Sequence, residues 1–131
     1  MAKILIVDDE PTIRELFRYV FEEAGHEVAQ AENGRAAFDR LSEGLPDFII
    51  LDIAMPEMSG KEFVLELGRR AVRDPRLSRI PFVVMTGEDL MEMELNRVFA
   101  ASPGFVCFFP KMIPPEMVLE KTLEVLGGGA V

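Results

Sequence analysis

Short apolar runs alternate with amphipathic segments along the chain. Four runs consist almost entirely of aliphatic and aromatic residues, at 4–7, 48–51, 82–85 and 106–109, and a weaker fifth run lies at 27–31. Strands of a parallel sheet are buried on both faces, so they read in sequence as continuous apolar stretches. The pattern predicts strands at residues 3–8, 27–31, 47–52, 80–85 and 105–109.

Each apolar run is followed by residues that typically begin or end helices. Pro11 suits the first turn of a helix, and Gly25 suits a helix end. Asn33 is a good N-cap, and Ser59 and Glu62 have the spacing of a capping box. These signals predict helices at residues 11–24, 33–43, 59–74, 88–101 and 114–126.

Apolar residues recur at helical spacing and predict the buried face of each helix. In the first and last helices they are Ile13, Leu16, Phe17, Val20, Phe21 and Ala24, and Leu119, Leu123 and Leu126. Five strands in regular alternation with five helices predict an α/β fold, a single doubly wound parallel sheet with helices on both faces. The 131 residues fit one domain, predicted at 1–126, with a glycine-rich tail at 127–131.

The composition narrows the classes of partner and the cellular compartment. A net charge of -9 disfavours direct binding to nucleic acid or to an anionic membrane. No apolar stretch approaches the roughly 20 residues that span a bilayer. Cys107 is the only cysteine and lies in an apolar run, so a buried thiol in a reducing cytoplasm is expected. His26, next to a turn glycine, is interpreted as a surface residue.

Five polar residues lie at or just past the ends of the predicted strands. They are Asp8, Asp9, Asp52, Thr86 and Lys111. Ligands of doubly wound folds bind beyond the carboxyl ends of the strands, so these residues are predicted to form one site. Taken singly, each has a simpler interpretation, since an aspartate or threonine at a strand end also serves as a helix cap or a turn residue.

The chemistry of such a site follows from its charges. Two carboxylates about 4 Å apart repel each other by roughly 4 kcal/mol at an effective dielectric constant near 20. Lys111 and a hard divalent cation would offset this repulsion, and Mg²⁺ prefers oxygen ligands while keeping several waters. Asp52, alone at its strand end, is the best candidate nucleophile for an acyl phosphate, with Asp8 and Asp9 as metal ligands. Thr86 and Lys111 are placed to contact a phosphoryl group.

The combined motifs resemble the receiver domain of bacterial two-component response regulators. The resemblance covers essentially the whole chain and depends on residues 7–11 (VDDEP), 51–60 (LDIAMPEMSG), 85–87 (MTG) and Lys111, in that order. It implies a flavodoxin-like fold with strand order 2-1-3-4-5. It also implies that Asp52 accepts a phosphoryl group from a histidine kinase or a phosphotransfer protein. The chain would then catalyse only its own phosphorylation and dephosphorylation.

The resemblance assigns further roles residue by residue. Asp9, Asp52 and the backbone carbonyl of Ala54 would bind Mg²⁺ directly, and Asp8 would bind it through water. Thr86 and Lys111 would contact the phosphoryl group. Thr86 and the aromatic Phe108 would act as the switch.

These switch residues would change the face formed by the fourth helix, fifth strand and fifth helix, which regulates a downstream protein and allows dimerisation. Gly60 matches the glycine of the loop after the acceptor. A role as phosphorelay intermediate is included in the same expectation.

The chain departs from the family pattern in three places. Met112 follows Lys111 where the family has a proline after a cis bond, and a cis bond before a non-proline residue costs about 2.5–4 kcal/mol. The loop is therefore either strained, or trans with the lysine aimed differently. Phe108 stands where tyrosine is common, and the region around the fourth helix is slightly long, which suggests an unusual partner.

Two other functions stay open at this point. One is a pseudo-receiver, an interaction module of the same fold that is never phosphorylated. The other is a Mg²⁺-dependent phosphohydrolase with an aspartyl nucleophile, disfavoured because Ala54 lies where one such class has a second aspartate.

Overall fold

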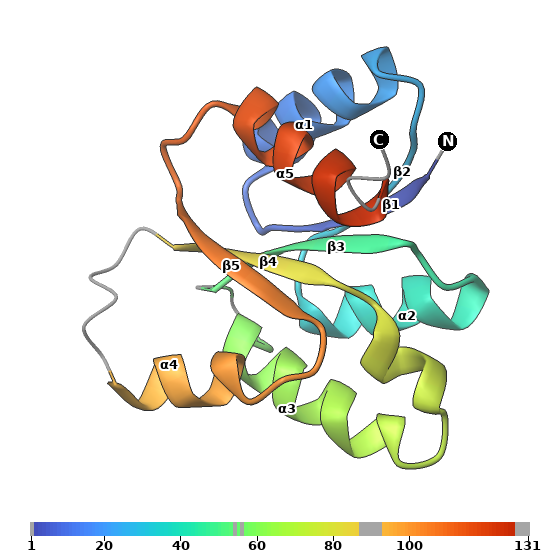
Figure 1. Ribbon diagram of the computed structural model, residues 1–131, viewed down its shortest axis with the longest axis vertical. Coiled ribbons are helices and arrows are strands. Elements are labelled where there is room, and N and C mark those ends of the chain that lie inside the picture. Colours follow the sequence, from blue (N-terminus) through green and yellow to red (C-terminus); the bar gives the residue numbers. More distant parts are fainter. Residues whose placement is uncertain (1, 54, 56, 87–92, 128–131) are drawn as a thin grey trace.

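Five parallel strands form one sheet in the order β2-β1-β3-β4-β5, with helices on both sides (Figure 1). The computed structural model describes residues 2–53, 55, 57–86 and 93–127. The strands are β1 (Lys3–Val7), β2 (Glu27–Ala31), β3 (Phe48–Asp52), β4 (Phe82–Thr86) and β5 (Phe105–Pro110). The helices are α1 (Pro11–Glu23), α2 (Gly34–Glu43), α3 (Gly60–Ala71), the 3-10 helix η1 (Pro75–Arg79), α4 (Met93–Ala100) and α5 (Pro115–Leu126). The predicted fold class and strand order are confirmed.

The sheet separates two apolar clusters. In Figure 1, α1 and α5 lie above the sheet, and α2, α3 and α4 lie below it. Alternate residues of β1 point to opposite sides, so Ile4 and Ile6 pack with α1 and α5, whereas Leu5 and Val7 pack with α2 and α3. All residues of β3 and β4 are buried, as the continuous apolar runs predicted.

The parallel register brings the carboxyl ends of the strands to one edge. Val7 is paired with Ala31 on one side and with Leu51 on the other. Asp52 is paired with Met85, and Thr86 lies beside the end of β5. Polar residues that follow these strands therefore meet at this edge, as parallel pairing requires.

The helix starts follow the predicted capping residues. Asn33 accepts a hydrogen bond from the Ala36 amide at 2.8 Å through Oδ1. Ser59 and Glu62 form a complete capping box, each side chain bonded to the other residue's backbone N–H. Gly25 has φ +92° in the turn after α1, a conformation that glycine adopts without a Cβ penalty.

The structure differs from the prediction at one helix end and on two helix faces, and part of a third predicted helix is not described. Helix α3 ends at Ala71, before the predicted Asp74: residues 72–73 form a turn, and Asp74 precedes Pro75, a position that disfavours helical backbone. Leu16 and Leu123 are 47% and 45% exposed, because their helices bury narrower faces than the apolar stripes suggest. Residues 88–92 of the predicted fourth helix lie outside the described residues.

Thr122 occupies the buried position of α5 that the leucine stripe did not predict. It is fully buried, and its Oγ1 donates to the Val118 carbonyl at 2.8 Å, so its hydroxyl carries no desolvation penalty. Within the described part of the chain, no helix is both long and apolar enough to cross a bilayer.

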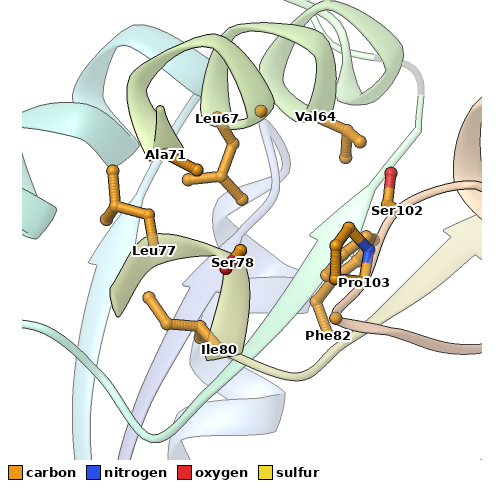
Figure 2. Close-up of a pocket in the computed structure, with 11 residues that line it drawn as sticks. Val64, Leu67, Ala71, Leu77, Ser78, Ile80, Phe82, Ser102 and Pro103 are labelled. Atoms are coloured by element: carbon orange, nitrogen blue, oxygen red, sulfur yellow. The ribbon is translucent and has the colours of Figure 1, made fainter. Parts of the chain in front are cut away.

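A small apolar cavity of about 40 Å³ lies between α3, η1 and the turn before β5 (Figure 2). Leu67 of α3 and Leu77 of η1 line it, and Pro103 closes its far side. Gly68 borders the cavity from the middle of α3, and an added Cβ there would meet no atom within 4 Å. The local packing therefore does not require a glycine at position 68.

Gly68→Ala should stabilise the protein by about 0.5–1 kcal/mol, because alanine is the better helix former and its Cβ would meet no atom within 4 Å. Urea unfolding followed by circular dichroism measures the change. Gly60→Ala in the same helix is the contrasting variant: its Cβ would lie 2.7 Å from the Asp52 carbonyl oxygen, so it should destabilise. Loss of stability in Gly68→Ala would contradict the packing described here.

Candidate functional site

Four acids gather where β1 and β3 end. Asp52 is the last residue of β3 and is 1% exposed, and Asp8, directly after β1, is 3% exposed. Asp9 and Glu10 follow on the exposed rim. The Asp8 amide donates to the Ala31 carbonyl at 3.0 Å, which extends the strand pairing and places the carboxylate beside β3.

Lys111 is the cation of this cluster. Its Nζ lies 3.2 Å from Oδ2 of Asp52 and 2.9 Å from Oε1 of Glu10. Its backbone amide donates to the Thr86 carbonyl at 3.0 Å, so the loop after β5 is tied to the end of β4. Although burial opposes it, the hydrogen bond to Glu10 and the charges of Asp52 and Asp8 raise the pKa of Lys111. The ammonium is therefore fully charged at neutral pH.

The surroundings of Asp8 disfavour its charged form. Its pKa is raised, mainly by burial, and the nearby charges of Asp9 and Glu10 add to the effect. The Glu10 amide, which donates to Oδ1 at 2.9 Å, and Lys111 partly oppose the rise. Native Asp8 therefore holds a proton more readily than an unfolded aspartate, and an added cation would relieve this cost.

The acids also satisfy the requirements of a hard divalent cation. One carboxylate oxygen from each of Asp8, Asp9 and Glu10 lies within 4.8 Å of the others. An all-oxygen donor set made of one buried and two exposed acids suits Mg²⁺, which takes few protein ligands and keeps its waters. Asp52 approaches the same edge from β3. The expected carbonyl ligand Ala54 lies outside the described residues.

The loop after Asp52 is attached to the start of two helices. The Gly60 amide donates to the Ile53 carbonyl at 3.0 Å, and a Cβ at Gly60 would clash with the Asp52 carbonyl. Glu57 has φ +65°, a conformation that costs a non-glycine residue about 1–2 kcal/mol. Its Oε2 accepts from Asn33 Nδ2 at 3.1 Å, a contact that joins the loop to α2. A glycine is thus required at position 60 by the close approach of the backbone to the end of β3.

Phe108 packs on the α4 side of the sheet. Its ring makes an edge contact with Phe99 of α4, with centroids 5.6 Å apart, and lies 4.9 Å from Phe105. The side chain is half-buried. The position joins the end of β5 to α4, where the resemblance places the switch aromatic.

The Lys111–Met112 bond resolves one alternative raised by the sequence. Among the described residues no peptide bond is cis, so the loop is trans. The lysine nevertheless reaches Asp52, and the expected misdirection does not occur. Met112 itself is almost fully exposed.

The structure therefore places Asp8, Asp9, Asp52, Thr86 and Lys111 at one edge, as the strand-end pattern predicted. Two neighbours were not predicted from the sequence: Glu10, which pairs with Lys111, and Arg14, whose Nη1 donates to the Asp8 carbonyl at 2.7 Å. In the sequence, Glu10 could have been assigned to the site because it directly follows the two aspartates. Arg14 could have been assigned only weakly, from its position one helical turn after Glu10.

Cys107 and His26 lie away from this edge. Cys107 is a half-buried free thiol that packs on the α5 side, and burial raises its pKa. His26 accepts a hydrogen bond from the Ala2 amide at 3.1 Å in the turn between α1 and β2. Neither contributes to the acidic site.

A flavodoxin-like 2-1-3-4-5 sheet with an acidic pocket and a lysine at its carboxyl edge defines the CheY-like class of α/β proteins. Residues 4–122 match the family described as the response regulator receiver domain, and the chain belongs to that family. It is therefore a signalling module of the two-component type.

Relatives and solved structures are similar over almost the whole chain. Protein PilH of Pseudomonas aeruginosa is 32% identical over 98% of this chain and 100% of its own. The phosphate regulon transcriptional regulatory protein PhoB of the same species is 34% identical over 94% of this chain but 51% of PhoB.

Chemotaxis protein CheY4 of Vibrio cholerae has a TM-score of 0.80 at 31% identity, covering 95% of this chain and 98% of its own. Response regulator TrrA of Thermotoga maritima, solved in complex with Mg²⁺-BeF, has a TM-score of 0.73 at 31% identity with the same coverage.

Asp8→Asn should stabilise the metal-free protein at neutral pH by on the order of 1 kcal/mol, because it keeps the oxygen that accepts from Glu10 and removes a buried charge. The raised pKa of Asp8 means that the native state binds the proton more tightly. The contribution of Asp8 to wild-type stability therefore falls as the pH rises from 3.8 through the raised native value.

Urea unfolding in EDTA at pH 7 and well below pH 3.8 tests this, and the gain should disappear at the lower pH. The exposed Asp39 of α2 provides the matched control, Asp39→Asn, which should change stability little at either pH. A less stable Asp8→Asn protein at pH 7 would contradict the electrostatic account.

Proposed function

We propose that this receiver domain accepts a phosphoryl group on Asp52 and acts as a switch for a partner protein. The observation that carries the proposal is the buried Asp52 carboxylate, with Lys111 Nζ 3.2 Å from Oδ2 and the Asp8–Asp9–Glu10 cluster at the same edge. A nucleophilic carboxylate needs charge neutralisation nearby when a phosphoryl group approaches, and this edge supplies it. The donor is a phosphohistidine of a sensor kinase or a phosphotransfer protein.

The transfer is a displacement at phosphorus. A bond forms between an Asp52 oxygen and phosphorus, the bond from phosphorus to the donor's imidazole nitrogen breaks, and the imidazole takes up a proton from solvent. Mg²⁺, held by Asp8, Asp9 and Asp52, would supply positive charge beside the transferring oxygens. Lys111 stays charged throughout, because its raised pKa keeps the proton on Nζ.

Lys111 and Thr86 then respond to the acyl phosphate. Lys111 exchanges its contact with the Asp52 carboxylate for one with a phosphoryl oxygen, while Glu10 keeps the ammonium in place. Thr86, tied to the Lys111 amide through its carbonyl, contacts a second phosphoryl oxygen. Phe108, between β5 and α4, transmits the change to the face made by α4, β5 and α5. That face is the proposed surface for the downstream partner and for dimerisation.

Incubation with acetyl phosphate or phosphoramidate and Mg²⁺ should add one phosphoryl group, seen by intact mass. Asp52→Asn should abolish the adduct, because the nucleophilic oxygen is lost. Asp39→Asn, at an exposed position of α2, should still be phosphorylated and is the matched control.

The other outcomes separate the competing functions. An unmodified wild-type protein would indicate a pseudo-receiver. Release of many phosphates per protein molecule from an added phosphomonoester would indicate a phosphohydrolase.

Mg²⁺ should raise the melting temperature, because it binds the native acid cluster and not the unfolded chain. At tenfold excess over its dissociation constant, the stabilisation is about 1.4 kcal/mol. Differential scanning fluorimetry with and without Mg²⁺ measures it. Asp9→Asn should weaken the response, whereas Asp39→Asn should preserve it, and an equal response in both variants would exclude the cluster as the metal site.

A cytoplasmic location belongs to the same proposal. Its support is the single free thiol, which is half-buried and has no disulfide partner in the chain.

A further inference from the structure

The charge of the chain is divided very unevenly. Residues 69–79 contain five of its fourteen lysines and arginines but one of its twenty-three acids. This segment therefore carries +4, and the remaining residues carry -13. The five arginines are Arg69, Arg70, Arg73, Arg76 and Arg79. A cationic segment of this density on an acidic domain indicates a surface suited to a negatively charged partner.

Three of these arginines, Arg70, Arg76 and Arg79, border two adjoining hollows. The first, about 380 Å³, lies between α2, α3 and η1, with Phe38, Leu41 and Leu77 in its apolar wall. The second, about 350 Å³, lies beside the start of β3. Arg76 and Leu45 line both, so the hollows form one groove, called here the arginine groove. Arg70 flanks its first part and Arg79 its second.

The arginine charges are partly matched within the domain and partly available to a partner. Arg70 stacks over the Phe38 ring at 3.9 Å from the centroid and pairs with Glu66 at 2.9 Å, and both contacts hold the guanidinium beside the groove. Arg76 pairs with its neighbour Asp74 at 2.9 Å and remains largely exposed. Arg79 is exposed and makes no ion pair with any residue that the structure describes.

Each acid that borders the groove already has its own donor within the domain. The pairs are Glu43 with Arg40, Asp74 with Arg76, and Asp47 with the Lys3 amide. These contacts reduce the repulsion that an incoming acid would meet. The groove therefore combines an apolar wall with a positive rim.

The groove lies far from the acidic site in the topology. It is formed by residues that precede β3 and β4, at the amino edge of the sheet, whereas Asp52 and Thr86 lie at the carboxyl edge. A ligand in the groove would therefore leave the phosphoryl site open. Of the elements α4, β5 and α5, only α5 reaches the groove, through its last residue, Leu126, which lines the second hollow.

We propose that the arginine groove binds an acidic segment of a partner protein, with one apolar side chain of that segment in the first hollow. A short peptide matches both parts of the groove, because its carboxylates meet the arginines and its apolar residue meets Phe38 and Leu77. A nucleic acid fits less well, because its backbone would continue from the small +4 region onto a surface of net charge -13.

The test uses a short fluorescein-labelled peptide of glutamates with one central leucine, and fluorescence anisotropy with the 131-residue chain. Binding should weaken as NaCl is raised. Arg76→Glu/Arg79→Glu should lower the affinity for the peptide by about tenfold or more. The double variant loses two positive charges that attract the peptide's glutamates and gains two negative charges that repel them. Arg35→Glu/Arg97→Glu, at two exposed arginines outside the groove, makes the same change in net charge and should bind the peptide nearly as wild type does.

Three results would overturn the proposal: no binding to the wild-type protein, equal loss in both double variants, or tighter binding of a single-stranded oligonucleotide of equal charge. Circular dichroism melts show whether each variant is folded. Both double variants should still take up a phosphoryl group from acetyl phosphate, so failure of the groove and failure of the Asp52 assignment give different results.

Discussion

The parallel pairing of β1, β3 and β4 is the constraint on which the rest of this domain depends. These strands are buried on both faces, so each must be apolar along its length, and their first polar residues come where the strands end. Parallel direction then places those residues at one edge. A concentration of carboxylates follows directly from the topology, and the chain offsets it with Lys111.

Lys111 is held by backbone and side chain together. Its amide is bonded to the end of β4, and its Nζ lies between Asp52 and Glu10. Because the anchoring bond joins main chains, the loop keeps the lysine directed at Asp52 although Met112, and not a proline, follows it.

Most of the fold could be predicted because its signals are local. Continuous apolar runs, Asn33 and the Ser59–Glu62 capping box depend on near neighbours, and the structure contains the strands and helix starts they imply. The five strand-end residues could also be placed together, since topology alone determines their common edge. By contrast, the side chain of Glu10 reaches a lysine 101 residues away, and no pattern in the sequence specifies that contact. The exposure of Leu16 and the burial of Thr122 likewise depend on how α1 and α5 pack together, which helical spacing does not determine.

The close approach of Gly60 to Asp52 has a consequence for how this sequence can diverge. The glycine begins α3, yet its lack of a side chain is required by the carbonyl of Asp52, which an alanine Cβ would approach to 2.7 Å. Position 60 is therefore constrained by the end of β3 and not by helix propensity. In a library of sequence variants selected only for folding, glycine should be retained at position 60 as strongly as in a library selected for signalling. A retained Gly60 in a diverged variant would thus indicate that the backbone of the loop is kept. It would not indicate whether the variant still signals.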